Sequence, residues 1–526
     1  MPAGPATRHA PPDPDARLID SLRADLAAAH LTVAAVEELL GAVAAAALHR
    51  EQPVPALRAT VPARAGDGPL PTLVRHLLLG EQVSRASLDR ALPRLGVAGA
   101  ERLGLVVPAG RSGHDAVRPL VDLRPYEAHD AAGPVSWWLA SDLGETATGA
   151  ALAADHVLGV GGASVTLAQL TVRTPARRAL DLGTGCGIQA LHAARHSDAV
   201  VATDVSARAL AFAAFNAALA GVDLDLRRGS MLEPVLPVPP DGGFDLVVSN
   251  PPFVITPRGG RAEVARYEYR DGGRAGDDLV RDLVRDVGRV LAPGGIAQLL
   301  GNWEHRDGED WRDRVGDWLD ASGLDAWVVQ REVLDPAQYV ETWLRDGGTT
   351  RDRDPLGWAR TYADWLTDFE DRGVDAVGLG LLVLRRPSEG GPTLRRLEEQ
   401  TGPVRRPLGE HLAAALRAHD WLTAHDDDAL LAARLVVAPD VTEERHLRPG
   451  AADPTLVLLR QGDGFGRVTR AGTALAGLVG ACDGELAVGQ ILGALAALLE
   501  TPVEGLRTAL LPAVRELVRD GLLRPA

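Results

Sequence analysis

Residues 178–194 read RALDLGTGCGIQALHAA, an apolar run followed by glycines at alternate positions and then by a helical pattern. Glycine adopts positive φ without penalty and lets the backbone come close to a ligand. The first N–H groups of a helix have no partner within the helix and point outward. The stretch therefore predicts a strand that ends at Asp181, a ligand-binding turn, and a helix that begins near Ile188.

The same alternation of short apolar runs with helical segments continues on the C-terminal side of this turn. Further apolar runs lie at residues 199–205, 244–250, 295–302, 325–332 and 376–386. Strands that alternate with helices indicate a mainly parallel sheet covered by helices on both faces. The fold class predicted for this region is α/β, a Rossmann-like doubly wound core.

The spacing of the glycines bears on the ligand. The turn has the pattern G-x-G-x-G, whereas the dinucleotide fingerprint is G-x-G-x-x-G. Asp181 precedes the first glycine by two residues, and this acid suits the cationic methionine end of S-adenosylmethionine better than a pyrophosphate. A tight turn without a ligand is the alternative. The candidate cofactor contacts in the turn are Asp181, Gly183, Thr184, Gly185, Cys186 and Gly187.

Two later positions extend this candidate cofactor site. Asp204 ends the next apolar run, 23 residues after Asp181. A carboxylate at this place in a βαβ unit can accept both ribose hydroxyls, although Asp followed by Ser is also a common helix cap. Ser230 and Met231 follow the third predicted strand and could contact the adenine ring, with a plain loop as the alternative.

Residues 244–253, FDLVVSNPPF, carry the catalytic prediction, because Asn250, Pro251, Pro252 and Phe253 follow a strand. Ligands of open α/β sheets bind beyond the carboxyl ends of the strands. The Asn250 side-chain carbonyl and the Pro251 backbone carbonyl can each accept one N–H of a planar amine or amide and stabilise developing positive charge. The prolines fix the backbone, and Phe253 offers a face for stacking. We expect Asn250 to contact the cofactor as well.

These residues resemble the class I S-adenosylmethionine-dependent methyltransferases with an Asn-Pro-Pro-aromatic motif, the small-domain group. The resemblance covers about residues 150–386. It implies an N-methyltransferase whose cofactor is S-adenosyl-L-methionine, with no metal. Two branches are most similar: enzymes that methylate glutamine of release factors, and enzymes that methylate guanine of ribosomal RNA. The multidomain arrangement also resembles methyltransferases of high-GC, actinobacterial-type bacteria.

The choice between branches rests on local features. The stretch 267–284 is similar to the loop and helix after the motif in the glutamine branch, whereas Phe253 resembles the ribosomal RNA branch. Several other residues could also line the pocket or a substrate groove, although a solvated salt-bridged face or plain packing is the alternative for them. These residues are Arg258, Arg261, Arg266, Arg270, Arg274, Tyr267, Tyr269, Asn302, Trp303, Glu304 and the stretch 161–169.

The flanking regions predict additional domains. Residues 70–97 read as helix, turn and helix, and strands follow them, the pattern of a winged helix. The predicted organisation is a disordered tail at 1–16, an N-terminal helical/winged-helix-like recognition domain at 17–149, the methyltransferase domain at 150–386 with a helical insertion at about 336–372, a linker at 387–406, and a mixed α+β, possibly winged-helix-like domain at 407–526.

Composition narrows the function classes. The net charge is −16, so a protein that coats nucleic acid through phosphate contacts is not expected. Two cysteines exclude a disulfide framework, and no apolar run is long enough to span a membrane. We expect a cytoplasmic enzyme with a macromolecular substrate, RNA or protein, and no membrane partner. A small-molecule methyltransferase and a cofactor-sensing, nucleic-acid-binding regulator remain alternatives.

Overall fold

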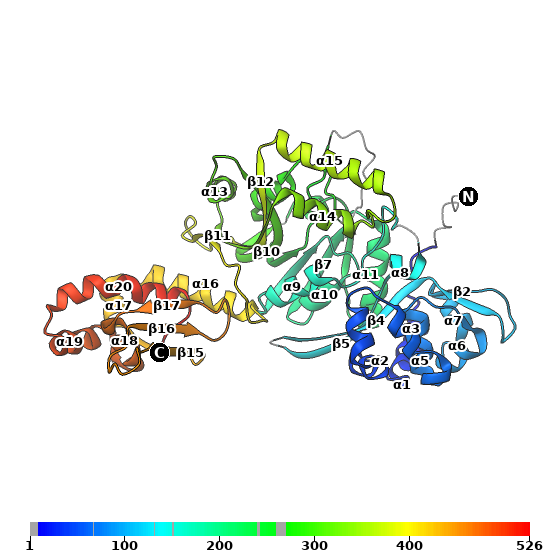
Figure 1. Ribbon diagram of the computed structural model, residues 1–526, viewed down its shortest axis with the longest axis horizontal. Coiled ribbons are helices and arrows are strands. Elements are labelled where there is room, and N and C mark those ends of the chain that lie inside the picture. Colours follow the sequence, from blue (N-terminus) through cyan, green and yellow to red (C-terminus); the bar gives the residue numbers. More distant parts are fainter. Residues whose placement is uncertain (1–8, 67, 131, 150–151, 239–241, 259–269) are drawn as a thin grey trace. The chain divides into compact units, whose positions relative to one another are not determined.

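The computed structural model describes residues 9–66, 68–130, 132–149, 152–238, 242–258 and 270–526 (Figure 1). The chain divides into two compact units. The first comprises residues 1–168 and 175–392, and the second comprises residues 169–174 and 393–526.

The centre of the first unit is a sheet in which seven of its strands lie in the order β11-β12-β10-β9-β6-β7-β8. β12 is antiparallel to both neighbours, and the other pairs between β10 and β8 are parallel. The strands are β6 (Ala176–Leu182), β7 (Ser197–Asp204), β8 (Asp225–Arg228), β9 (Phe244–Ser249), β10 (Leu291–Arg306), β11 (Asp325–Leu334) and β12 (Val374–Arg385).

Helices connect these strands, as the alternating pattern predicts. α10 packs against α11, and α12 packs against α13. The helices are α9 (Gly162–Leu170), α10 (Ile188–Ala193), α11 (Ala207–Ala220), α12 (Asp278–Asp286) and α13 (Trp311–Ser322). Interior strands such as β9 read as continuous apolar runs because they are covered on both faces, and Leu246, Val247 and Val248 are buried. The predicted Rossmann-like, doubly wound core is confirmed.

A helix–strand–helix–helix–hairpin sequence precedes the core. It runs through α5 (Pro69–Leu73) with its π-helical continuation η1 (Val74–Leu78), β1 (Val83–Ser84), α6 (Arg85–Ala91), α7 (Gly96–Arg102), β2 (Val106–Pro108) and β3 (Ala116–Pro119). The three strands form an antiparallel sheet in the order β1-β3-β2. This is the topology of a winged helix, as the sequence predicts.

The remaining N-terminal elements connect this region to the core. They are α1 (Ala16–Ala28), α2 (Val33–Leu48), α3 (Val54–Ala59), α4 (Pro62–Ala65), the hairpin β4 (Val121–Asp130) and β5 (Gly133–Asp142), and α8 (Glu145–Thr148). One hydrophobic cluster includes Leu26, Leu73, Leu123, Leu191 and Phe212, from α1 through α11. The boundary predicted at residue 149 therefore falls inside one compact unit.

Within the described residues, no single helix is long and apolar enough to cross a membrane. The pair α1 and α2, bent by 49°, passes that test only when taken together.

The prediction of a disordered tail at residues 1–16 is wrong for residues 9–15, which form hydrogen bonds with the rest of the chain. The Asp13 amide donates to the Leu103 carbonyl at 2.9 Å, and the Asp15 side chain accepts from the amides of Arg17 and Leu18 at the start of α1. Pro-rich composition predicts a lack of burial, but it does not reveal contacts with distant backbone groups such as Leu103.

Two helices lie between β11 and β12, in the segment predicted as a helical insertion. They are α14 (Pro336–Asp346) and α15 (Pro355–Asp371). Asp335 and Asp354 cap them through side-chain bonds to the amides of Gln338 and Gly357. The two helices have a hydrophobic cluster of their own, which also contains Val254 and Ile255. The insertion therefore packs directly against the segment after the NPPF motif.

The second unit combines helices with two small antiparallel sheets, ordered β18-β14-β19 and β15-β16-β17, so the predicted mixed α+β character is confirmed. Its elements are α16 (Gly409–Ala424), α17 (Asp427–Ala432), β14 (Arg434–Val437), β15 (Val441–His446), β16 (Leu456–Gln461), β17 (Val468–Ala471), α18 (Thr473–Gly480), β18 (Asp483–Ala487), α19 (Val488–Leu498), α20 (Val503–Arg519) and β19 (Leu523–Pro525). The elements α18, β18, α19, α20 and β19 follow one another in the order of a winged helix. The central strand of their sheet is β14, which comes earlier in the chain.

The predicted linker at 387–406 contains a strand, which corrects that expectation. β13 spans Arg395–Glu399. Arg396 forms an ion pair with Asp520 at 2.8 Å, and Glu398 pairs with Arg467 at 2.7 Å. The sequence shows Pro and Gly on both sides of this stretch, but it does not show these distant partners.

Candidate functional site

The candidate site lies where the strand order of the sheet changes direction. From β6 the chain proceeds outward through β7 and β8, and it then returns to β9 on the other side of β6. Leu182 and Ser249 are partners in the parallel β6–β9 pair, and the Ser249 hydroxyl donates to the Leu182 carbonyl at 2.7 Å. The glycine turn and the NPPF motif therefore leave neighbouring strands side by side, at the switch point where open α/β sheets bind ligands.

The glycine turn has the backbone that its sequence predicts. Gly183, Gly185 and Gly187 have φ of 76°, 54° and 91°. A Cβ added at Gly183 or Gly185 would meet nothing within 4 Å, whereas one at Gly187 would lie 3.2 Å from Ala213. Gly187 therefore allows α11 to approach closely, while the other two leave open space beside the turn.

The open space beside Gly185 predicts how Gly185→Ala affects stability and cofactor binding. The left-handed conformation costs an alanine about 1–2 kcal/mol, and the added methyl group would enter the space proposed for the cofactor. We expect a small loss of thermal stability and loss of the protection that S-adenosylmethionine gives against unfolding. Gly323→Ala is the matched control, because Gly323 has φ of 65° and open surroundings far from the turn. Equal protection of both variants in a thermal shift assay would contradict the prediction.

Asp181 holds the turn in place, and its predicted contact with the methionine end of the cofactor stays a prediction. Its side chain is buried, and Oδ2 accepts from the Thr184 hydroxyl at 2.6 Å and from the Ala190 amide at 2.9 Å. These bonds join β6, the turn and α10. Oδ2 therefore anchors the turn, and burial raises the pKa of Asp181 to about 7.

This raised pKa predicts a pH dependence of stability. The folded carboxyl still binds a proton where the unfolded carboxyl, with a pKa of 3.8, has released it. Between pH 3.8 and about 7 the folded state holds more protons, so the free energy of unfolding falls as pH rises. We expect wild type to lose stability relative to Asp181→Asn across this window in chemical unfolding. Parallel curves for the two proteins would contradict this expectation.

Asp204 links the glycine turn to the end of β7. Its Oδ2 accepts from the Gly185 amide and its Oδ1 from the Ser206 amide, both at 2.9 Å. The alternative to the ribose interpretation was a helix cap, but the N-cap of α11 is Ser206, and the bond from the Ser206 amide to Asp204 is a local turn. The ribose role of Asp204 stays a prediction.

Ser230 and Met231 lie at the same edge of the sheet. The Gly229 amide donates to the Asp204 carbonyl at 3.0 Å, which brings this loop beside Asp204. Met231 has φ of 47°, uncommon for a residue with a side chain. Such strain is frequent at ligand sites, and it supports the predicted adenine contact at Met231.

Two residues of the predicted cofactor set point into the protein. The Cys186 side chain belongs to the hydrophobic cluster that joins α10 and α11, and burial raises the pKa of its thiol to about 11. The Thr184 hydroxyl is used by Asp181. The side chains of both residues are therefore used inside the protein, and the cofactor contact predicted for Thr184 and Cys186, which the backbone of the turn could make, stays a prediction.

The NPPF motif begins directly after β9, whose last four residues are buried. Asn250 Oδ1 is inaccessible to solvent and has no hydrogen-bond partner among the described residues. A buried acceptor without a partner is rare and costs stability. The Pro251 carbonyl accepts from the Phe253 amide at 2.8 Å, and its second lone pair stays available. Asn250, Pro251, Pro252 and Phe253 thus present two carbonyl acceptors beside an aromatic ring.

Sequence reasoning missed the residues that support this motif from behind. The Tyr339 hydroxyl accepts from the Ile255 amide at 3.0 Å and from Asn302 Nδ2 at 2.9 Å. The rings of Phe253 and Trp343 meet edge-to-face, with centroids 6.3 Å apart. Tyr339 and Trp343 lie four residues apart on α14, so one helix face provides both contacts. Only the aromatic content of the insertion pointed to them.

The arginines after the motif are largely ion-paired. Arg258 pairs with Asp271 at 2.6 Å, Arg270 with Asp346 at 3.3 Å, and Arg274 with Asp282 at 3.7 Å. This favours the salt-bridged interpretation for these three residues. Arg261, Arg266, Tyr267 and Tyr269, which were also considered for the pocket or a groove, lie outside the described residues.

Asn302, Trp303 and Glu304 lie within β10, which extends to Arg306. Trp303 donates to Gln330 at 2.8 Å. Glu304 is fully buried and pairs with Arg306 and Arg372. Glu304 and Trp303 are therefore used in packing and ion pairing, and Asn302 supports Tyr339.

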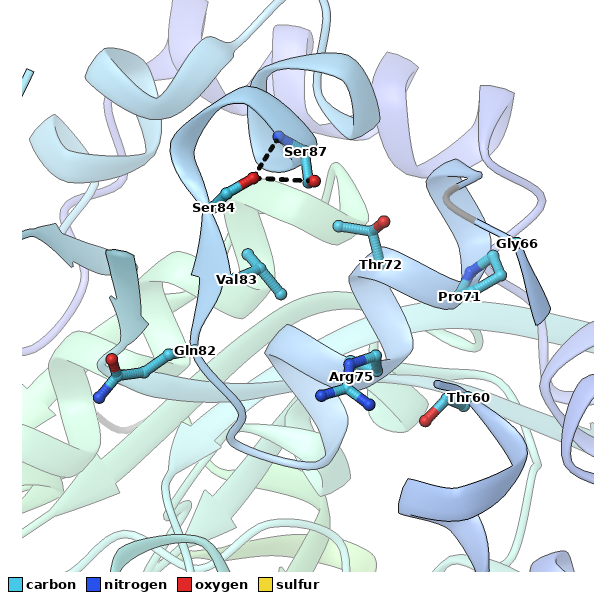
Figure 2. Close-up of a pocket in the computed structure, with 9 residues that line it drawn as sticks. All are labelled: Thr60, Gly66, Pro71, Thr72, Arg75, Gln82, Val83, Ser84 and Ser87. Carbon is cyan, nitrogen blue, oxygen red and sulfur yellow. Dashed lines mark hydrogen bonds between the residues drawn. The ribbon is translucent and has the colours of Figure 1, made fainter. Parts of the chain in front are cut away.

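A separate cavity of about 200 Å³ lies in the winged-helix region, and Figure 2 shows nine residues that line it. They come from α3 to α6, and the Ser84 hydroxyl at the start of α6 bonds to the amide and hydroxyl of Ser87. None of the predicted site residues lines this cavity. It is therefore distinct from the site at the sheet switch point.

Comparison with known proteins connects the central region to a family. Residues 159–265 match the family described as Methyltransferase small domain. Residues 28–119 and 413–525 match families described as Domain of unknown function (DUF7059) and Domain of unknown function (DUF7782). The match to a methyltransferase family thus includes both the glycine turn and the NPPF motif.

Curated relatives match over the same region. A release factor glutamine methyltransferase of Deinococcus radiodurans is 39% identical over 128 residues, covering 23% of this chain and 44% of the relative. A ribosomal protein uL3 glutamine methyltransferase of Bradyrhizobium diazoefficiens is 35% identical over 174 residues, covering 30% and 53%. A ribosomal RNA small subunit methyltransferase C of Alcanivorax borkumensis is 28% identical over 127 residues, covering 24% and 33%. The chain spans about half the length of the first two relatives and a third of the other.

Proposed function

We propose that this protein is an S-adenosylmethionine-dependent N-methyltransferase that acts on a planar amide or amine of a macromolecule. The observation that carries the proposal is the buried, unpartnered Asn250 Oδ1 beside the glycine turn. An acceptor in this position is costly unless a substrate N–H completes it. The relatives and the matched family support the same chemistry.

The residues around the glycine turn fit S-adenosylmethionine. Open space adjoins Gly183 and Gly185, the Asp204 carboxylate lies beside the turn and bonds to the Gly185 amide, and Met231 has a positive φ. Asp204 would hold the ribose, Met231 the adenine, and the turn the methionine end. The bound cofactor supplies a methyl group on a positively charged sulfur.

The chain's own residues orient the nucleophile. Asn250 Oδ1 and the Pro251 carbonyl accept the two hydrogens of the NH₂ group, which turns the nitrogen lone pair towards the methyl carbon. The new N–C bond forms as the S–C bond breaks, and the surplus proton leaves the nitrogen to water. The two carbonyls stabilise the positive charge that develops on nitrogen, and Phe253 stacks on the planar group. This positioning provides most of the expected acceleration.

We propose a glutamine side chain of a protein as the substrate. Arg258, Arg270 and Arg274 are paired with carboxylates, which lowers the net positive charge that this segment offers to RNA phosphates. The glutamine methyltransferases are also the more similar of the relatives named above. A guanine of ribosomal RNA is the second candidate, favoured by Phe253 in place of the tyrosine usual in the glutamine branch. Either substrate agrees with the predicted cytoplasmic location.

The test uses the whole chain, methyl-labelled S-adenosylmethionine and a methylation-naive cell extract. Label that requires Asn250 and is released by protease would support the glutamine proposal. Label that requires Asn250 and is released by ribonuclease would replace glutamine with an RNA base. Absence of Asn250-dependent label from both fractions would contradict a macromolecular substrate.

A further inference from the structure

α14 contacts the catalytic motif through two side chains that no part of the proposed chemistry uses. Tyr339 is fully buried on this helix, and its hydroxyl oxygen accepts from the Ile255 amide and from Asn302 Nδ2. Ile255 is only two residues after Phe253. The Tyr339 hydroxyl therefore fixes the backbone directly after NPPF to β10 on one side and to the insertion on the other.

A second contact fixes the aromatic ring of the motif. Trp343 meets Phe253 with an angle of 81° between the rings, an edge-to-face arrangement. Trp343 is itself held, because Arg270 donates to its carbonyl at 2.7 Å and the Arg270 carbonyl accepts from the Val254 amide at 2.9 Å. The segment 253–255 and α14 are thus joined at three successive residues.

For this reaction, a fixed position of the Asn250 and Pro251 carbonyls matters more than the strength of the hydrogen bonds that they accept. A displacement of about 1 Å at a reacting group can lower the rate about 100-fold. Asn250 and Pro251 gain rigidity from β9 on their N-terminal side, but on their C-terminal side they continue into a segment without regular structure. α14 supplies the missing support.

We propose that Tyr339 is a positioning residue for methyl transfer, which acts by holding residues 250–255 through the Ile255 amide, with Trp343 as its partner on the same helix. The inference rests on the proposed function, since it assigns Tyr339 to that site. Burial raises the pKa of Tyr339 well above its usual range, so the hydroxyl stays protonated and does not act as a base.

Tyr339→Phe tests the inference, because it removes the hydroxyl and keeps the ring. Tyr362→Phe is the matched control: Tyr362 lies on α15 in the same cluster, and its hydroxyl bonds to Glu341 and Ala337, away from the motif. We expect Tyr339→Phe to lower kcat about 10- to 100-fold and to leave the affinity for S-adenosylmethionine within about twofold. The control should retain wild-type kcat.

Hydrogen exchange of the segment 250–255, read in the whole chain without substrate, tests the contact separately. Exchange at Ile255 should rise about tenfold in Tyr339→Phe, since its hydrogen bond is lost, and stay unchanged in the control. Unchanged exchange at Ile255 in Tyr339→Phe would overturn the inference, whether or not the wild type transfers a methyl group. A wild type that transfers no methyl group would instead contradict the proposed function. Equal losses of kcat in both variants would also overturn it.

A second pair of variants covers the case in which Tyr339→Phe does not fold. Trp343→Phe keeps an aromatic ring at this position but makes a smaller contact with Phe253. Trp358→Phe on α15 is the control for this variant. The inference requires a lower kcat for Trp343→Phe alone. An unchanged kcat in that variant would overturn the role of α14.

Discussion

Asn250→Ala is expected to lower kcat by a factor of about 10²–10³, which corresponds to about 3–4 kcal/mol of transition-state stabilisation. The alanine removes one of the two acceptors that orient the nucleophile, at the point where positive charge develops. Affinity for S-adenosylmethionine should change far less, because the glycine turn and Asp204 are untouched. Single-turnover transfer and calorimetric binding measure the two quantities separately.

Gln52→Ala is a suitable control for this variant. Gln52 is an exposed side-chain amide in the N-terminal part of the chain, and its loss should leave both quantities unchanged. A kcat for Asn250→Ala within a factor of about three of wild type would remove Asn250 from the mechanism. A large loss of cofactor affinity with normal single-turnover transfer would assign Asn250 to cofactor binding instead.

Arg314→Met is expected to destabilise the first unit by about 3–5 kcal/mol, the usual cost of leaving a buried carboxylate without its partner. Asp277 is 1% exposed, and Arg314 reaches both of its oxygens, at 2.6 and 3.1 Å. Methionine retains most of the side-chain volume, so the loss would come from the charge. Chemical unfolding gives the difference in free energy.

The same helix contains the control for this prediction. Arg312 on α13 pairs with Asp310 at 3.4 Å, and both side chains are about half exposed. Arg312→Met should therefore cost less than about 1 kcal/mol. Similar losses for the two variants would show that the methionine disturbs α13 itself, and not that the buried pair stabilises the fold.

The local sequence pattern was sufficient to predict the α/β core and the residues at the centre of the candidate site. The apolar runs fixed the strands, and glycine at alternate positions fixed the turn with three positive φ angles. Asp204 ends β7 and Asn250 directly follows β9, and parallel strands bring their carboxyl ends to one edge. These features depend on neighbours along the chain, which a sequence shows directly.

Features that depend on distant partners could not be predicted in this way. Asp181 was expected to face a ligand, but its partners Thr184 and Ala190 become visible only once the turn is folded. β13 forms inside a Pro/Gly-rich stretch. Tyr339 is 84 residues from Ile255, and no spacing rule connects them. The supporting residues of the site therefore needed the three-dimensional structure.

The composition of the second unit has a consequence for synthesis on the ribosome. Residues 169–174 belong to that unit, and the Gln169 carbonyl accepts from the Leu408 amide at 2.8 Å. At about 5–20 residues per second, the ribosome needs on the order of 10–50 s to add the 239 residues that separate these two. During that interval the C-terminal end of α9 has no bonding partner at Gln169. The segment 169–174 can therefore complete its packing only after the ribosome has added the start of α16.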